Sequence, residues 1–228
     1  MNQALVIVAK APRPGKCKTR LCPPFSPDQA AELYRCFLLD TISIARDAVA
    51  AESAPTAITL IYPNGDREWL SSLIPPCVRL LPQHRVDLGA VLQGAFQDHL
   101  ADGHQRVVIM GTDSPSMPAS LISEAFYVLK NHDLVLGPAR DGGYYLIGLK
   151  QSHPPLFEHI AWSEDRVLAQ TLARAGKLEL DVFLLPPWYD IDTVAELQEL
   201  ISEIDMGARA VQTANFFQLH GKMKSALV

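Results

Sequence analysis

The chain has 228 residues, of which 48% are hydrophobic, enough for the core of one sizeable α/β domain. Its net charge is −5, but residues 1–27 hold five basic side chains and no acidic one, so the remaining residues carry a net charge of −10. A general nucleic-acid binder spreads basic charge over a whole face, and this distribution excludes that class. The short basic segment is instead typical of a site for a small anion.

The sequence predicts a cytoplasmic protein without a membrane span. No apolar run approaches the ~20 residues that cross a bilayer. The first charged residues follow the first apolar run instead of preceding it, which is the wrong order for a signal peptide. The four cysteines form no C-x-x-C pair, so we expect free thiols, and the seven histidines lack zinc-ligand spacing.

Along the chain, short apolar runs alternate with longer stretches of helical periodicity. The first run, residues 4–9, is continuously apolar and predicts a strand buried on both faces. Ser26, followed by Pro27 and Gln29, predicts the start of a helix that ends near residue 51. The other predicted strands are residues 57–62, 78–81, 106–110, 134–136, 144–148 and 180–185. The other predicted helices are residues 67–73, 88–100, 119–130, 164–175 and 193–204.

This alternation predicts an α/β fold, with a mostly parallel sheet and helices on both of its faces. Residues 141–149 break the pattern, because Gly142 and Gly143 lead directly into an apolar strand. We expect an antiparallel strand or a hairpin there, which makes the sheet mixed. A single domain over residues 1–205 accounts for these elements. Residues 206–228 follow as a tail, and their weak patterning does not predict where they dock.

A basic loop follows the first strand, at the end of the sheet where open α/β folds bind their ligands. Phosphates need cationic side chains and free backbone N–H groups, and a loop that contains Gly supplies both. The loop is not a P-loop, since Lys10 stands at the first Gly position and Cys17 replaces the Ser or Thr that holds Mg²⁺. A merely solvated basic loop is the alternative. Its basic side chains are Lys10, Arg13, Lys16, Lys18 and Arg20.

Two acidic segments follow other predicted strands and are candidates for metal binding. Asp113 comes just after a buried strand, where a carboxylate can hold Mg²⁺ or Mn²⁺ against a diphosphate. Asp190 and Asp192 stand at i and i+2 in an extended segment, so their side chains point the same way. The alternatives are that Asp113 caps a turn, and that Asp192 or Thr193 only caps the following helix.

Taken together and in this order, the motifs resemble those of the DUF2064 family of glycosyltransferase-like proteins, from residue 4 to about residue 200. That family is similar to the nucleotide-diphospho-sugar transferases, which have the GT-A fold, and to phospholactate guanylyltransferases and molybdenum-cofactor nucleotidyltransferases. The motifs are Lys-x-Pro-x-x-Gly-Lys-x-Lys-Thr-Arg-Leu at 10–21, Gly-Thr-Asp-Ser-Pro at 111–115, Gly-Pro-x-x-Asp-Gly-Gly-Tyr-Tyr-Leu-Ile-Gly-Leu at 137–149, Trp-Ser at 162–163 and Asp-Ile-Asp-Thr at 190–193.

The resemblance implies a single GT-A-like, Rossmann-like domain and a role for each motif. The basic loop would wrap the phosphates of a nucleotide or sugar nucleotide, while Asp113 and Asp192 would hold Mg²⁺ or Mn²⁺. The implied catalytic residues are Lys18, Arg20 and Asp113. The implied nucleotide-binding residues are Lys10, Pro12, Gly15, Lys16, Lys18, Thr19, Arg20 and Gly111. The implied residues on the side of a small-molecule acceptor are Asp141, Gly142, Gly143, Tyr144, Trp162 and Ser163.

The sequence departs from the family pattern at two places. The family commonly continues Asp-Leu-Gly with Glu-Arg, where this chain has Ala90 and Val91. It also commonly has Thr after Trp-Ser, where this chain has Glu164. The missing Arg removes a phosphate or acceptor contact that the resemblance would otherwise imply.

The resemblance leads us to expect, first, a metal-dependent glycosyl transfer from a sugar nucleotide to an acceptor. The alternative is nucleotidyl transfer from a nucleoside triphosphate to a small phosphorylated or hydroxylated acceptor. The strongly cationic loop favours this alternative, as does Asp113, which has no neighbouring D-x-D motif. A third interpretation, a protein that binds a nucleotide without turning it over, rests on the departure at Ala90 and Val91.

Overall fold

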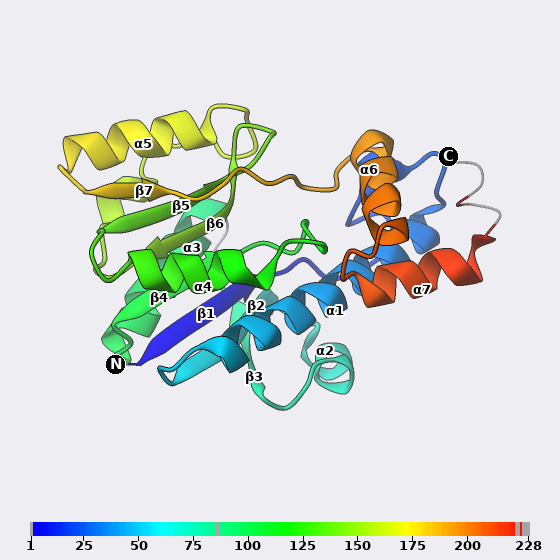
Figure 1. Ribbon diagram of the computed structural model, residues 1–228, viewed down its shortest axis with the longest axis horizontal. Coiled ribbons are helices and arrows are strands. Elements are labelled where there is room, and N and C mark those ends of the chain that lie inside the picture. Colours follow the sequence, from blue (N-terminus) through cyan, green and yellow to red (C-terminus); the bar gives the residue numbers. More distant parts are fainter. Residues whose placement is uncertain (1, 85–86, 222–223, 225–228) are drawn as a thin grey trace.

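The computed structural model of the protein describes residues 2–84, 87–221 and 224, and within them the strands form one seven-stranded sheet in the order β3-β2-β1-β4-β6-β5-β7 (Figure 1). β6 runs antiparallel to β4 and β5, and the other paired strands run parallel. The predicted mixed α/β sheet is therefore confirmed. The strands are β1 (Gln3–Val8), β2 (Thr56–Pro63), β3 (Val78–Gln83), β4 (Arg106–Met110), β5 (Leu134–Pro138), β6 (Tyr144–Leu149) and β7 (Val182–Leu184).

The direction of β6 follows from its short connection to β5. A parallel crossover needs a dozen or more residues, and only five separate Pro138 from Tyr144. The turn is closed locally, because Asp141 Oδ1 accepts a hydrogen bond from the Gly143 N–H at 2.8 Å. Gly142 has φ of +89°, a conformation that side chains with a Cβ rarely adopt. The two glycines therefore mark a hairpin, as the sequence predicts.

Helices cover both faces of the sheet (Figure 1). Successive side chains of a strand point to opposite faces, so Leu5 packs toward α1 and α4 while Val6 packs toward α3. In the described residues no helix is long and apolar enough to cross a membrane. The helices are α1 (Pro27–Ala51), α2 (Arg67–Leu73), α3 (Leu88–Ala101), α4 (Ala119–Val128), α5 (Val167–Lys177), α6 (Val194–Asp205) and α7 (Val211–Leu219), with 3-10 turns η1 (Thr19–Leu21) and η2 (Pro154–Phe157).

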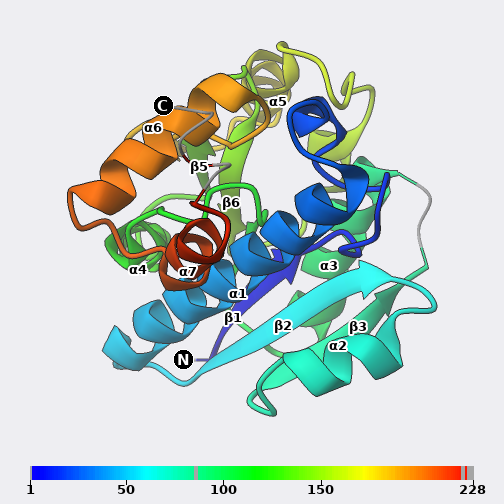
Figure 2. The ribbon, with the colours of Figure 1, turned by 90° about the vertical axis from the view of Figure 1, so that its right-hand side faces the viewer.

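A further apolar cluster lies beyond the sheet, where the first half of α1 meets η1, α6 and α7 (Figure 2). Leu21 of η1, Phe37 of α1, Leu197 of α6 and Phe216 of α7 are all buried in it. This cluster fixes the end of the basic loop and the start of α6 against the same support. Two segments that are more than 170 residues apart in the sequence are thereby brought together.

The chain after residue 205 forms α7, which packs on α1, a docking that the sequence did not predict. Asp40 of α1 is buried and caps the new helix. Its Oδ1 accepts the Gln212 N–H at 2.9 Å, and its Oδ2 accepts the Thr213 N–H at 2.9 Å and the Thr213 hydroxyl at 2.7 Å. Residues 222–223 and 225–228 of the predicted tail lie outside the described residues.

Several observed elements differ from the predicted ones by one or two residues at an end, and α5 and β7 begin at least two residues later than predicted. α5 begins at Val167, three residues later than predicted, because Ser163 is left-handed (φ 70°) and Glu164 N–H bonds back to the Ala161 carbonyl in a turn. β7 begins two residues later than predicted, since the Leu180 N–H bonds back to α5. Local turn geometry therefore shortens both elements.

Candidate active site

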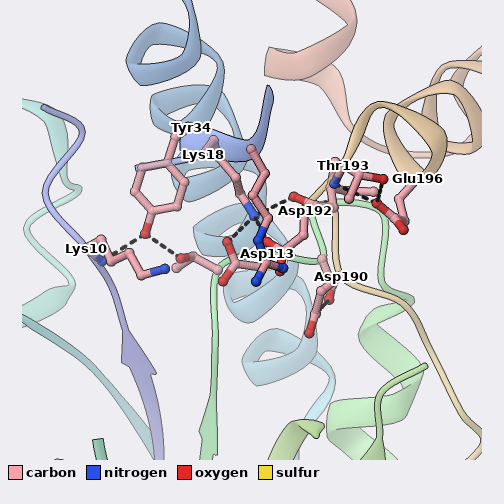
Figure 3. Close-up of polar contacts among 12 residues, drawn as sticks. Lys10, Lys18, Tyr34, Asp113, Asp190, Asp192, Thr193 and Glu196 are labelled. Carbon is pink, nitrogen blue, oxygen red and sulfur yellow. Dashed lines mark hydrogen bonds and ion pairs between the residues drawn. The ribbon is translucent and has the colours of Figure 1, made fainter. Parts of the chain in front are cut away.

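A buried lysine connects three segments of the chain at the carboxyl end of the sheet (Figure 3). Lys18 comes from the basic loop, Asp113 from the loop after β4, and Asp192 from the segment before α6. The Lys18 side chain is 3% exposed, and its ammonium lies between the two carboxylates. It forms an ion pair with Asp113 Oδ1 and another with Asp192 Oδ1 at 3.1 Å, and it also donates a hydrogen bond to the Ile191 carbonyl.

The local backbone explains why Lys18 points inward. Its φ of 47° and ψ of 38° are left-handed, and this turn places Cys17 and Leu21 in the apolar cluster on either side of it. The Leu21 N–H then bonds back to the Lys18 carbonyl at 3.0 Å. The loop is thus tied down on both sides of Lys18, although the sequence alone marks it only as basic.

Burial and ion pairing oppose each other in setting the protonation of this group. Burial by itself raises the pKa of Asp113, but the nearby Lys18 and Lys10 ammonium groups outweigh it and leave the pKa below its usual range. Burial by itself lowers the pKa of Lys18, but Asp113 and Asp192 outweigh it and leave that pKa raised. Both groups are therefore charged at neutral pH.

Thr193, and not Asp192, caps α6. The Thr193 side chain accepts a hydrogen bond from the Ala195 N–H, and Glu196 accepts from the Thr193 N–H at 2.6 Å, which completes a capping box. Asp192 is therefore available to Lys18 and to Arg20, whose Nη1 lies 3.5 Å from Asp192 Oδ2. Asp113 likewise pairs with Lys18 instead of closing a turn.

Asp190 lies beside this centre, and the sequence singled it out only as the neighbour of Asp192. Its Oδ1 accepts a hydrogen bond from the Ser114 hydroxyl at 2.5 Å. Burial raises the pKa of Asp190 to about 6, with Asp113 and Asp141 adding to the effect and Ser114 and Lys18 opposing it. The i, i+2 spacing of two aspartates after a predicted strand is the sequence signal that points to it.

Tyr34 of α1 also belongs to the site, and sequence reasoning missed it. Its hydroxyl is 2.6 Å from Thr112 Oγ1 and accepts the Lys10 N–H at 2.8 Å. It is 1% exposed, and burial raises its pKa above the usual range. Tyr34 thus joins the end of β1 to the loop after β4. Its position on the buried face of a long helix resembles that of any core aromatic, so the sequence carried no signal for this role.

The rest of the basic loop lies on the surface around this centre. Arg13 pairs with Asp66 at the start of α2. Lys10 and Lys16 are exposed and have no carboxylate within ion-pair distance among the residues described. Pro12 is half-buried. The other predicted nucleotide-binding positions, Gly15, Thr19, Arg20 and Gly111, are exposed.

The predicted acceptor-side residues gather around the β5–β6 hairpin. A Cβ on Gly142 would lie 2.0 Å from the Asp165 carbonyl oxygen, so only glycine fits between these two segments. Tyr144 and Trp162 meet edge to face with ring centroids 6.5 Å apart. Ser163 next to Trp162 is exposed. The hairpin borders the segment that leads to the Lys18 centre, because the Arg140 N–H donates to the Trp188 carbonyl, two residues before Asp190, at 3.1 Å.

The donor set is compatible with a hard divalent cation, for which Asp113 and Asp192 would be the protein ligands. Asp113 Oδ1 and Asp192 Oδ1 converge on one point, the Lys18 ammonium. Over the described part of the chain, no group of three or more His, Cys, Asp or Glu side chains is arranged to hold a metal. Mg²⁺ commonly uses one or two carboxylates and takes its remaining ligands from substrate phosphates and water, so two carboxylates are enough.

Sequence comparison identifies the family to which the chain belongs. The model of the family described as "Uncharacterized protein conserved in bacteria (DUF2064)" matches residues 45–164, more than half of the chain. The chain belongs to the DUF2064 family. A 3-phospho-D-glycerate guanylyltransferase from Phenylobacterium zucineum is 30% identical over 179 residues, covering 72% of this chain and 79% of that protein. A 2-phospho-L-lactate guanylyltransferase from Methanothermobacter thermautotrophicus is 27% identical over 173 residues, covering 72% and 74%.

Solved structures agree with this assignment. A protein of Desulfovibrio desulfuricans G20, provisionally named a nucleotide-diphospho-sugar transferase, superposes with a TM-score of 0.85 at 32% identity and 97% coverage of both chains. A manganese complex of Rv0371c from Mycobacterium tuberculosis superposes at 0.53 with 15% identity, covering 88% of this chain and 98% of that one, and shows the fold alone. The comparisons confirm the predicted family and fold and place the chain among transferases. The guanylyltransferase relatives favour nucleotidyl transfer over glycosyl transfer, which the sequence analysis put first.

Proposed function

We propose that the protein transfers a nucleotidyl group from a nucleoside triphosphate to a small phosphorylated or hydroxylated acceptor. The observation that carries this proposal is the convergence of Lys18, Asp113 and Asp192 at the carboxyl end of the sheet, beside Lys10 and Lys16, which are exposed and have no carboxylate partner among the described residues. The names of the two guanylyltransferase relatives support this reaction for the family.

In this reaction an acceptor oxygen attacks the α-phosphorus, the bond from that phosphorus to the bridging oxygen breaks, and pyrophosphate leaves. Negative charge builds on the phosphate oxygens, so the protein needs mainly to position the reactants and to neutralise charge. Lys10, Lys16 and Arg20 would bind the phosphates, with the backbone around Gly15 and Gly111 open to them. Lys18 would lie deeper, next to the carboxylates.

Asp113 and Asp192 would hold Mg²⁺ or Mn²⁺. When bound, such an ion screens the charge of the phosphate oxygens and helps to orient them. Asp113 is suited to this task because its pKa is lowered and it stays ionised. Asp190, with its pKa raised to about 6, would lie at the border between the metal carboxylates and the acceptor residues.

The acceptor would bind beside the hairpin that carries Asp141, Gly142 and Gly143. Tyr144 and Trp162 would form its apolar wall. The departure at Val91 does not disturb this arrangement, since the Val91 side chain is buried in the apolar cluster under α3 and faces the core. The other departure, Glu164, pairs with Arg166 on the surface.

The products distinguish nucleotidyl transfer from its alternatives. We expect purified protein, Mg²⁺, GTP or another nucleoside triphosphate, and 3-phosphoglycerate or 2-phospholactate to release pyrophosphate and form a nucleotidylated acceptor. The reaction would slow by roughly 10²–10³-fold in Asp113→Asn and keep its rate in Asp28→Asn, which changes an exposed aspartate on α1. A pyrophosphate assay measures the leaving group, and mass spectrometry of the product identifies the group transferred. Absence of pyrophosphate from every triphosphate tested would contradict the proposal.

Glycosyl transfer is a second candidate because the structure with the TM-score of 0.85 bears the name of a nucleotide-diphospho-sugar transferase. It predicts release of a nucleoside diphosphate from a sugar nucleotide, and no pyrophosphate. The same reaction mixtures, supplied with sugar nucleotides in place of triphosphates, separate the two chemistries by their leaving group.

A further inference from the structure

The Lys18 ammonium occupies the position in which two carboxylates and a backbone carbonyl present their oxygens to one cation (Figure 3). These three oxygens belong to Asp113, Asp192 and Ile191. A hard divalent cation also requires oxygen ligands and a negative electrostatic potential. The ammonium and the cation therefore need the same two carboxylates.

The backbone segments that carry Asp113 and Asp192 are fixed relative to each other. They are joined, because the Ile191 N–H donates to the Asp113 carbonyl at 2.8 Å. The capping box at Thr193 and Glu196 fixes the segment on its other side. The segment that carries Asp113 follows the central strand β4, which pairs with β1 and β6.

The Lys18 side chain is the member of the group that can move. Its flexible four-carbon stem ends in a point charge without a fixed coordination geometry. Its backbone is tied down, but Lys16, Thr19 and Arg20 around it are exposed, so the side chain has a route to the surface without movement of the backbone. A shift of this ammonium toward the surface brings it among the bases that would face a nucleotide's phosphates.

We propose that Lys18 competes with the divalent cation for Asp113 and Asp192, so that metal binding releases its ammonium to pair with the nucleotide's phosphates. The inference rests on the metal site of the proposed function and adds a regulation of that site. Without nucleotide, the released ammonium loses its carboxylates and gains no partner, which opposes metal binding. With nucleotide, the phosphates accept it, so metal and nucleotide bind cooperatively.

Mn²⁺ titration of the full chain tests this competition. We expect Lys18→Met to bind Mn²⁺ roughly tenfold more tightly than wild type when no nucleotide is present, because the competing charge is gone. We expect GTP to strengthen Mn²⁺ binding in wild type and to do so much less in Lys18→Met. Lys16→Met is the matched control, since it removes an exposed base from the same loop, and it should keep the wild-type Mn²⁺ affinity without nucleotide.

Equal or weaker Mn²⁺ binding by a folded Lys18→Met variant would overturn the inference, because Lys18 would then be holding the carboxylates in place for the metal. If no variant binds Mn²⁺ with or without GTP, the metal site of the proposed function fails as well. If Mn²⁺ binds but Lys18→Met gives no gain, only the competition fails. The two failures are therefore distinguishable.

Wild-type protein supplies a second measurement, which stands even if Lys18→Met does not fold. Reductive methylation followed by mass spectrometry reports the accessibility of each lysine amine. Lys18 is 3% exposed and should react slowly, whereas the exposed Lys16 should react fast. Saturating Mg²⁺ alone should raise the rate at Lys18 severalfold and leave Lys16 unchanged. Continued protection of Lys18 at saturating Mg²⁺ would contradict its displacement.

Discussion

Two aspartates in different regions of this molecule illustrate two ways of stabilising a carboxylate that is shielded from water: Asp40 is buried, and Asp113 is partly buried, with its side chain 29% exposed. Asp40 lies between α1 and α7, where backbone N–H groups and a hydroxyl bond its oxygens. Burial raises the pKa of Asp40, and the hydrogen bonds to Gln212 and Thr213 only partly offset this. Asp113 lies in the candidate active site beside an ammonium, and its pKa is lowered despite burial.

The two aspartates differ in how easily their partners can move. The neutral donors around Asp40 belong to the start of a helix and move only if that helix moves, so the contact fastens one element to another. The partner of Asp113 is a single flexible side chain that can be replaced by another cation. Asp40, whose donors are neutral and fixed, therefore stabilises the fold. Asp113, whose partner is an exchangeable cation, is suited to a role in binding or catalysis.

The largest expected effect is on activity at Asp113. Asp113→Asn keeps the shape of the side chain but removes the charge, and we expect the transferase rate to fall by roughly 10²–10³-fold. Initial rates of pyrophosphate release at saturating substrate measure this loss. Asp28→Asn should retain the wild-type rate. A variant of Asp113 with full activity would remove this residue from the catalytic machinery and make its ion pair purely structural.

The next effect is on stability at Asp40. Asp40→Ala leaves the Gln212 and Thr213 N–H groups without their acceptor at a buried helix start, so we expect the free energy of unfolding to fall by about 2–4 kcal/mol. Urea denaturation measures it. Asp47→Ala is the control on the same helix, since its exposed pair with Arg209 is worth about 0–1 kcal/mol. Equal losses in both variants would contradict the role assigned to Asp40.

The third prediction concerns pH and Asp190. Its folded pKa of about 6 exceeds its ordinary value, so the fold favours the protonated form and Asp190 costs stability as the pH rises through about 6. Asp190→Asn, which mimics that form, should be more stable than wild type by about 1–3 kcal/mol at pH 7. The gap should close near pH ~4, where the ordinary carboxyl is half protonated. Urea denaturation of both proteins at the two pH values measures this difference in stability. A difference that grows at acid pH would show that the pKa of Asp190 is not raised in the folded protein.

The smallest effect is expected at Arg20, which contacts Asp192 from the surface at 3.5 Å. Because this pair is largely exposed, Arg20→Gln should change the free energy of unfolding by less than about 1 kcal/mol. Its loss should weaken nucleotide binding severalfold, since one charge-assisted contact to phosphate disappears. Isothermal titration with GTP measures the affinity. Unchanged affinity would place Arg20 outside the nucleotide site.

Much of the fold follows from local features that can be read in sequence. The apolar run of β1 and the Ser26 capping box predict elements that the structure contains. The paired glycines before β6 predict a hairpin because glycine readily adopts the positive φ that tight turns need, as Gly142 does. Even the resemblance to the DUF2064 family depends on short motifs of this kind. What these features lack is information on turns such as the left-handed one at Ser163, which delays α5.

In the candidate site, too, the sequence predicted some residues and missed others. The sequence marked Lys18, Asp113 and Asp192 by charge and by position after strands, and all three meet in the structure. It offered no signal for Tyr34, whose hydroxyl is indistinguishable in sequence from that of a core tyrosine. It likewise grouped Arg13 with the other bases of the loop, although Arg13 turns to Asp66.

The sequence by itself determined the elements, the class of fold and the residue types available at the carboxyl ends of the strands, because periodicity and capping act over a few residues. The tertiary structure decided which charges meet. Lys18 and Asp192 are 174 positions apart in the sequence, and they pair because η1 and α6 share one apolar cluster with α1. The contact between Asp40 and α7 is equally distant. Contacts over such separations are set by packing, which a local pattern does not contain.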